Sequence, residues 1–100
     1  MNYNTRAKVY TNAYIQYGER NQMVVAIEEL SECQKEICKA LRGNINEDHL
    51  AEEIADAMIM LEQMQMYFGL NEKVEHYMDN KIVRLDRKLR GCAFAEALGE

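Results

Sequence analysis

The sequence predicts an all-α fold, built as an antiparallel helical bundle of about four helices. The chain of 100 residues contains no proline and is rich in the strong helix formers Ala, Leu, Met, Glu, Gln, Lys and Arg. Glycines divide it into segments that are long enough to form helices, and none of these segments shows the apolar–polar alternation of a β-strand. Because the connections are short, neighbouring helices are expected to run antiparallel.

Each expected helix ends close to one of these glycines. The four helices are expected to cover about residues 5–17, 19–41, 47–68 and 71–90. Asn46 is a good N-cap for the third helix, because its short side chain can accept a hydrogen bond from a free amide of the first turn. We therefore expect residues 1–91 to form one domain and residues 92–100 to form a short C-terminal tail.

The composition narrows the class of protein. Three cysteines without CxxC spacing indicate reduced thiols. The sequence shows neither an apolar stretch long enough to span a membrane nor a signal peptide. We therefore expect a cytoplasmic protein with no membrane partner. The net charge of −5 and the lack of a sustained basic, aromatic stripe argue against nucleic-acid binding. A small chain with 48% hydrophobic residues and no disulfide is expected to form a homo-oligomer, as a homodimer or a homotetramer.

Charge is distributed unevenly along the chain. Residues 28–62 contain ten acidic and three basic residues, a local charge of −7. Residues 81–90 contain five basic residues and one acidic residue, a local charge of +4. An acidic segment that binds a metal and a basic segment that meets an anion together suit a metal-bound polyphosphate, although both segments could also be ordinary solvated helix faces.

Two pairs of carboxylates carry the functional prediction. Glu29 and Glu32 lie three residues apart on the second expected helix, and Glu53 and Asp56 lie three residues apart on the third. Residues at this spacing share one face of a helix, with Cβ atoms about 5–6 Å apart. Four acids in two facing pairs repel one another unless a cation lies between them, and hard oxygen ligands suit Mg²⁺ or Mn²⁺ better than Zn²⁺.

The acidic pairs border the apolar faces on which we expect the bundle to pack. The expected apolar face of the second helix consists of Met23, Ala26, Ile27, Leu30, Cys33 and Ile37. The expected apolar face of the third helix consists of Leu50, Ile54, Ala57, Leu61, Met64 and Phe68. The predicted ligands therefore flank the core and are not centred on the solvent-exposed face.

At these residues the chain resembles the MazG-like all-α nucleoside triphosphate pyrophosphohydrolases. That family carries an EExxE motif, a spacer and an ExxD motif. Here Glu28-Glu29-x-x-Glu32 is followed by 20 residues and then by Glu53-x-x-Asp56. Further similarity lies around Tyr17-Gly18, in AEEIADAMIMLEQM and in KIVRLDRKL, so that the resemblance covers roughly residues 7–90.

The resemblance implies a metal-dependent hydrolase. It implies that Glu29, Glu32, Glu53 and Asp56 bind Mg²⁺, with Glu28 in support, and that a nucleoside triphosphate is hydrolysed between its α- and β-phosphates. It also implies a homo-oligomeric helical assembly.

Further roles are predicted for residues near the four ligands and in the basic segment. Glu32 is the candidate general base, which would take a proton from the attacking water. Lys81 and Arg84 are the candidates for binding the β- and γ-phosphates, although dipole interactions at a solvated helix end explain them equally well. Gln22 borders the same stripe as Glu29 and is expected to contact the base or the sugar.

The acidic pairs also have three other interpretations. A ferritin-like di-iron bundle requires Glu-x-x-His motifs, but Asn46 and Lys73 stand three residues before His49 and His76. The sequence leaves two alternatives open. One is a non-catalytic helical module for oligomerisation or partner binding with a residual metal site, and the other is a family member that has lost its activity.

Overall fold

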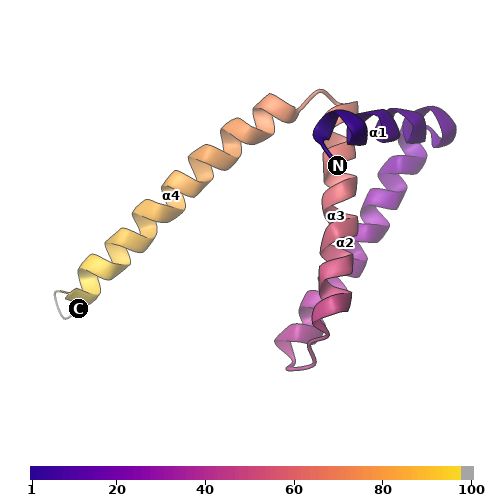
Figure 1. Cartoon of the computed structure of the whole chain (residues 1–100). Helices are drawn as coiled ribbons and strands as arrows, with labels where there is room; N and C mark the ends of the chain where they lie inside the picture. The colour runs from indigo at the N-terminus through magenta and orange to yellow at the C-terminus, as the bar shows by residue number, and fades with distance from the viewer. Residues whose placement is uncertain (98–100) are drawn as a thin grey trace. The chain divides into compact units, whose positions relative to one another are not determined.

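The computed structural model describes the backbone of residues 1–97 and the side chains of residues 1–92. Within these residues the chain forms four α-helices and no strand, which confirms the all-α prediction (Figure 1). The helices are α1 (Tyr3–Tyr17), α2 (Glu19–Leu41), α3 (Glu47–Tyr67) and α4 (Asn71–Ala97). The chain divides into two compact units, one comprising Met1–Gly69 and the other beginning at Leu70 and containing α4.

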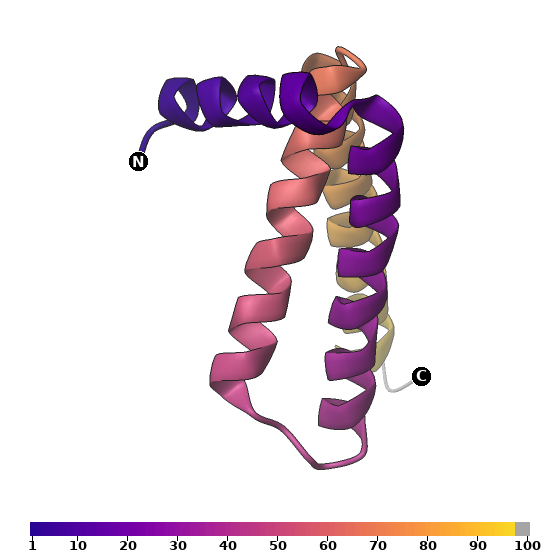
Figure 2. The ribbon, with the colours of Figure 1, turned by 90° about the vertical axis from the view of Figure 1, so that its right-hand side faces the viewer.

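The helices α2 and α3 form an antiparallel hairpin that is the main structure of the first unit (Figures 1 and 2). Gly43 follows the end of α2 with a φ of 83°, a left-handed backbone conformation that glycine adopts without steric cost. Asn46 caps α3, because its side-chain oxygen accepts a hydrogen bond of 3.1 Å from the backbone N–H of His49. The predicted cap is therefore confirmed.

The helix α1 lies across the end of this hairpin, as Figure 2 shows. The hydroxyl of Tyr67 on α3 lies 2.7 Å from the carbonyl oxygen of Tyr10 on α1. Tyr10 is buried and donates a hydrogen bond of 2.5 Å to the carboxylate of Glu62, which also pairs with Arg6 at 3.3 Å. Burial and this carboxylate together raise the pKa of Tyr10 from 10 to about 12, so the phenol remains a hydrogen-bond donor even in moderately alkaline solution.

The buried contact between α2 and α3 differs from the expected apolar faces. Small or flexible apolar residues and polar residues fill it, namely Gln22, Ala26, Glu36, Ala57, Met60 and Gln63. The larger apolar side chains expected there, such as Ile27, Ile37 and Leu61, are 68%, 54% and 43% exposed. The expectation that these large apolar side chains pack against the other helix is therefore wrong for this hairpin, because small apolar and polar residues fill the contact. The predicted ligands Glu29, Glu53 and Asp56 are partly buried.

This packing leaves an exposed apolar stripe on each helix of the hairpin. The stripe of α2 consists of Met23, Ile27, Leu30 and Ile37, and that of α3 consists of Ile54, Met58, Leu61 and Phe68. At 100° per residue, both stripes lie roughly a quarter turn away from the α2–α3 contact. Since the two helices run antiparallel, that rotation brings both stripes to the same face of the hairpin. We call this surface the apolar face.

The second unit consists of a longer helix than the sequence predicted. The helix α4 continues through Gly91 to Ala97, whereas we expected it to end near Arg90. Glycine within a helix costs only about 1 kcal/mol relative to alanine, and good helix formers such as Arg90 and Ala93 stand close to Gly91 on either side. The segment expected as a tail at 92–100 is thus helical as far as Ala97, and its last three residues lie outside the described part.

No helix in the described part of the chain combines the length and the apolar character needed to cross a membrane.

Candidate metal centre

Three of the four predicted metal ligands meet between α2 and α3. Glu29 projects from α2, and Glu53 and Asp56 project from α3. One carboxylate oxygen from each residue lies within 4.8 Å of the others, and all three side chains are partly buried. We call these three residues the carboxylate cluster.

Helix geometry explains why α3 contributes two members of this cluster. Residues three positions apart differ by about 60° around a helix, so Glu53 and Asp56 point toward the same neighbour. The buried Ala57 stands directly beside Asp56, and Ala26 lies one turn before Glu29. Small side chains at these positions allow the two helices to approach closely enough for carboxylates from both of them to meet.

The cluster is electrostatically unfavourable without a cation. The pKa of Glu29 is raised above its usual value, first by burial and then by the charges of Asp56 and Glu53, with smaller effects from Glu32 and Glu28. Two unit charges at 4.8 Å repel by about 3–4 kcal/mol at an effective dielectric constant of about 20. Exposure to solvent reduces this figure, but the sign of the interaction is the same for every pair in the cluster.

One oxygen of the cluster is buried without a hydrogen-bond donor. The Oε2 atom of Glu53 finds no partner among the described residues, whereas its Oε1 lies 3.6 Å from Nε2 of His49. A buried carboxylate oxygen without a donor costs about 1–3 kcal/mol or more, because it has lost its hydration. A bound cation would compensate that loss.

A second polar contact between the two helices lies beside the cluster. Nδ1 of His49 on α3 lies 3.2 Å from Oε1 of Glu36 on α2, and Nζ of Lys39 lies 3.0 Å from the same oxygen. Glu36 is only 5% exposed, so two donors next to it offset the unfavourable burial of its charge. His49 therefore links the buried Glu36 to Glu53 of the cluster.

The periodicity of a single helix does not reveal this contact, because Glu36 and His49 lie on different helices. The register between the helices would have revealed the contact, because Glu36 follows Glu29 by seven residues and His49 precedes Asp56 by seven. Seven residues are two helical turns, so one facing pair predicts the next.

The same register extends in the other direction to a pair of glutamines. Gln22 precedes Glu29 by seven residues and Gln63 follows Asp56 by seven, and both glutamines line one cavity. Polar pairs therefore recur every two turns along the α2–α3 contact. Their order is the glutamine pair, the carboxylate cluster and the Glu36–His49 pair.

The remaining predicted site residues lie outside the carboxylate cluster. Glu32 and Glu28 are exposed on α2, close enough to the cluster to contribute to the raised pKa of Glu29. Lys81 and Arg84 belong to the second unit, where they line a surface hollow of about 250 Å³ together with Lys88. The roles predicted for these residues stay predictions.

The donor set fits a hard divalent cation. All three ligands are carboxylates, whereas zinc sites use mainly cysteine and histidine. Mg²⁺ binds oxygen at about 2.0–2.1 Å, so two ligands on opposite sides of the ion lie about 4.2 Å apart. Small side-chain rotations suffice to bring oxygens that lie within 4.8 Å of one another to that distance.

Comparison of the chain with protein-family models, with curated proteins and with solved structures gives no match.

The raised pKa of Glu29 predicts how stability depends on pH in the absence of divalent ions. The folded state holds the Glu29 proton more tightly than the unfolded state, whose pKa is near the ordinary value of 4.5. This contribution to stability is fully present below that value and is lost as the pH rises through the folded pKa. Glu29→Gln, which removes the charge, should therefore be more stable than the parent at pH 7 in EDTA, and its advantage should shrink toward pH 4.5.

Urea denaturation of both proteins at several pH values in EDTA would measure this difference. The control is Glu52→Gln, which removes an exposed carboxylate of α3 outside the cluster and should change stability little at any pH. A Glu29→Gln protein that is less stable than the parent at pH 7 would show that the Glu29 charge is stabilising and not repelled.

Proposed function

We propose that this chain is a Mg²⁺-dependent nucleoside triphosphate pyrophosphohydrolase of the MazG-like kind. It hydrolyses ribo- or deoxynucleoside triphosphates to a nucleoside monophosphate and pyrophosphate. The observation that carries the proposal is the convergence of Glu29, Glu53 and Asp56 within 4.8 Å. These residues come from both halves of the two-part acidic motif that suggested the family.

The cluster and its neighbour would hold the cation. Glu29, Glu53 and Asp56 supply three oxygen ligands, and Glu32 stands one turn beyond Glu29 as the fourth. Mn²⁺ has the same preference for oxygen and would be expected to substitute for Mg²⁺. A divalent ion at this position supplies neutralisation of phosphate charge and a lowered pKa for water.

The chain's own residues would then perform proton transfer. The oxygen of a water attacks the α-phosphorus, the bond between that phosphorus and the oxygen bridging to the β-phosphate breaks, and pyrophosphate leaves. Glu32 is exposed beside the cluster, so its carboxylate can accept the proton of the water. The exposed Glu28 lies one turn before Glu32 and supports the site by adding negative charge near the cation.

Lys81 and Arg84 of α4 remain the candidates for binding the β- and γ-phosphates. Together with Lys88 they line a single hollow in the second unit, and this concentration of positive charge suits phosphate groups.

A second copy of the chain would cover the apolar face. Eight apolar residues of α2 and α3, defined above as the two stripes, are each at least 40% exposed. Full burial of one such side chain stabilises by about 1.5–3 kcal/mol, so the face offers a large driving force for association. Two hairpins that pack through this face would form a four-helix arrangement, as a homodimer or as half of a homotetramer.

The exposed apolar face also favours an alternative function. A non-catalytic oligomerisation or partner-binding module would use the same surface and could retain a residual metal site. Mg²⁺ would stabilise such a protein, but the protein would release no pyrophosphate.

Asp56→Asn should separate stability from activity. Asparagine keeps the shape of aspartate but removes one charge from a repelling cluster, so in EDTA the variant should be as stable as the parent or more stable. With Mg²⁺ it should lose the metal-induced rise in melting temperature. Loss of a partner that merely orients a metal ligand costs about 10–100-fold, so loss of a ligand should reduce turnover by at least about a hundredfold.

Thermal melts with EDTA and with Mg²⁺, combined with an assay for released pyrophosphate, test this prediction. Asp48→Asn is the matched control, because it makes the same change at an exposed position of α3 outside the cluster. A fully active Asp56→Asn protein would contradict the proposal, as would release of inorganic phosphate by the parent. Metal-induced stabilisation of the parent without any turnover would favour the non-catalytic alternative.

The apolar face predicts self-association that a single charge disrupts. The parent should have at least twice the mass of one chain by light scattering at micromolar concentration. Ile27→Asp places a charge in the centre of the face, where Ile27 is exposed, and should shift the mass to that of a monomer. Ile15→Asp, at an equally exposed position on α1, should leave the mass unchanged. A monomeric parent would show that the apolar face has another occupant.

A further inference from the structure

His49 lies between a buried glutamate of α2 and a member of the carboxylate cluster on α3. Its Nδ1 atom is 3.2 Å from Oε1 of Glu36, and its Nε2 atom is 3.6 Å from Oε1 of Glu53. Each nitrogen of an imidazole ring can carry a hydrogen, so the ring can be held by a carboxylate on either side. His49 therefore forms a polar link from α2 to one of the three ligands proposed for the cation.

The start of α3 fixes the backbone at His49. The N–H of this residue donates to the side-chain oxygen of the N-cap Asn46 at 3.1 Å. Glu53 follows His49 by four residues, so the two side chains lie on the same face of the helix. The cap therefore determines the level at which the ring of His49 meets Glu53.

Glu36 is a fixed support for the ring. This residue is only 5% exposed, and Nζ of Lys39 donates to its Oε1 atom at 3.0 Å. Moving a buried carboxylate away from its partners would leave its charge uncompensated, which is strongly unfavourable. His49 is therefore attached to α2 through a group that cannot reorient freely.

The two oxygens of Glu53 have different surroundings. Oε1 is the atom that contacts His49, whereas Oε2 is buried and has no hydrogen-bond partner among the described residues. A carboxylate that is held through one oxygen keeps its other oxygen in a fixed direction. The contact with His49 therefore leaves Oε2 as the oxygen of Glu53 that is available to a cation.

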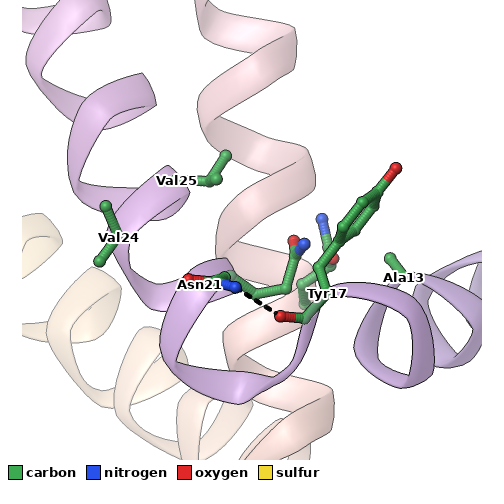
Figure 3. A pocket seen from close by; sticks show the side chains of 7 residues that line it. Ala13, Tyr17, Asn21, Val24 and Val25 are labelled. Atoms are coloured by element: carbon green, nitrogen blue, oxygen red, sulfur yellow. Dashed lines mark hydrogen bonds between the residues drawn. The ribbon is translucent and has the colours of Figure 1, made fainter.

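The other end of the α2–α3 contact offers the cluster no comparable support. Figure 3 shows the cavity at that end, where Asn21 donates to the carbonyl oxygen of Tyr17 at 2.8 Å. The residues that line this cavity include no Asp, Glu, Lys, Arg or His. Among residues 1–92, the pair between His49 and Glu53 is the only ion pair that involves the carboxylate cluster.

We propose that His49 is a positioning residue for the metal centre. It holds Glu53 through Oε1, so that this carboxylate is already oriented when the cation arrives. The inference rests on the proposed function, because it concerns the same cation. His49 is not a member of the carboxylate cluster, and it acts on the ion through Glu53. Loss of a partner that orients a metal ligand in this way costs about 10–100-fold in metal affinity.

Two amide substitutions separate the two contacts of the ring. The side-chain nitrogen of asparagine lies close to the position of Nδ1, and that of glutamine lies close to the position of Nε2. His49→Asn keeps the contact with Glu36 but loses the contact with Glu53, so it should weaken Mn²⁺ binding by about tenfold or more. His49→Gln keeps the contact with Glu53 and should bind Mn²⁺ nearly as tightly as the parent. Electron paramagnetic resonance of free Mn²⁺ measures both affinities.

The matched control is His76→Asn. It makes the same change at the other histidine of the chain, which lies on α4 in the second unit, and should bind Mn²⁺ as the parent does. Thermal melts in EDTA show whether each variant is folded before Mn²⁺ is added. If His49 only joined the two helices, His49→Asn would bind Mn²⁺ like the parent, or both His49 variants would lose affinity equally. Either result would overturn the positioning role.

The parent protein allows a second measurement that needs no substitution at His49. The chain contains two histidines, so NMR of the ring signals reports on His49 and His76 alone. Saturating Mg²⁺ should shift the signals of His49, because the ion binds the carboxylate that the ring contacts, and should leave those of His76 in place. An unshifted His49 signal would refute the inference. Electron spin-echo measurements of bound Mn²⁺ should show no coupling to a histidine nitrogen, since such a coupling would make His49 a ligand.

The positioning role and the proposed function fail in different experiments. If His49→Asn weakens Mn²⁺ binding in a protein that releases no pyrophosphate, the positioning role is supported and the proposed function is refuted. If the parent releases pyrophosphate but His49→Asn binds Mn²⁺ equally well, only the positioning role is refuted. A parent that binds no Mn²⁺ refutes both.

Discussion

The antiparallel register between α2 and α3 determines what the first unit can do. It sets Glu29 opposite Glu53 and Asp56. Two turns away in one direction, Gln22 and Gln63 line the same cavity. Two turns away in the other direction, Glu36 contacts His49. A shift of one helix by a single turn would separate all three polar pairs at once. The proposed metal centre and the Glu36–His49 contact are consequences of one packing arrangement, so they would be lost together.

This arrangement lowers the stability of the fold, because the contact between the helices buries few apolar side chains and brings like charges together. Within the described residues the buried apolar side chains are only Tyr10, Ala26, Ala57 and Met60, whereas the contact between the helices also buries Gln22, Glu36 and Gln63. Repulsion within the carboxylate cluster adds a further unfavourable contribution, which exposure to solvent reduces. A cation at the cluster and a second copy on the apolar face would each offset part of that cost, so we expect the folded state to depend on both.

Periodicity and capping were enough to predict the helices and most of the cluster. Spacing of three residues placed Glu53 and Asp56 on one face of α3, and Asn46 marked where that helix begins. Periodicity did not predict which face of each helix contacts the other helix. Large apolar residues such as Ile27 indicate burial, but they do not indicate which surface covers them. In this chain small and polar residues make the contact between α2 and α3. Periodicity also failed at Gly91, where the preference of the flanking residues for helix outweighs the cost of one glycine. The contact between Glu36 and His49 depends on interhelical register, which no single helix encodes.

Mn²⁺ binding followed by electron paramagnetic resonance would show whether the carboxylate cluster binds a divalent cation. Mn²⁺ prefers the same oxygen ligands as Mg²⁺ and gives a sharp signal when it is free in solution. We expect the parent protein to reduce the free-Mn²⁺ signal with a stoichiometry of one ion per chain, and added Mg²⁺ to restore the signal. We expect Glu53→Gln to weaken Mn²⁺ binding by at least about tenfold. Glu52→Gln, at the exposed neighbouring position, should bind Mn²⁺ as the parent does. Equal Mn²⁺ binding by the parent and Glu53→Gln, or no binding by the parent at millimolar Mn²⁺, would contradict the account.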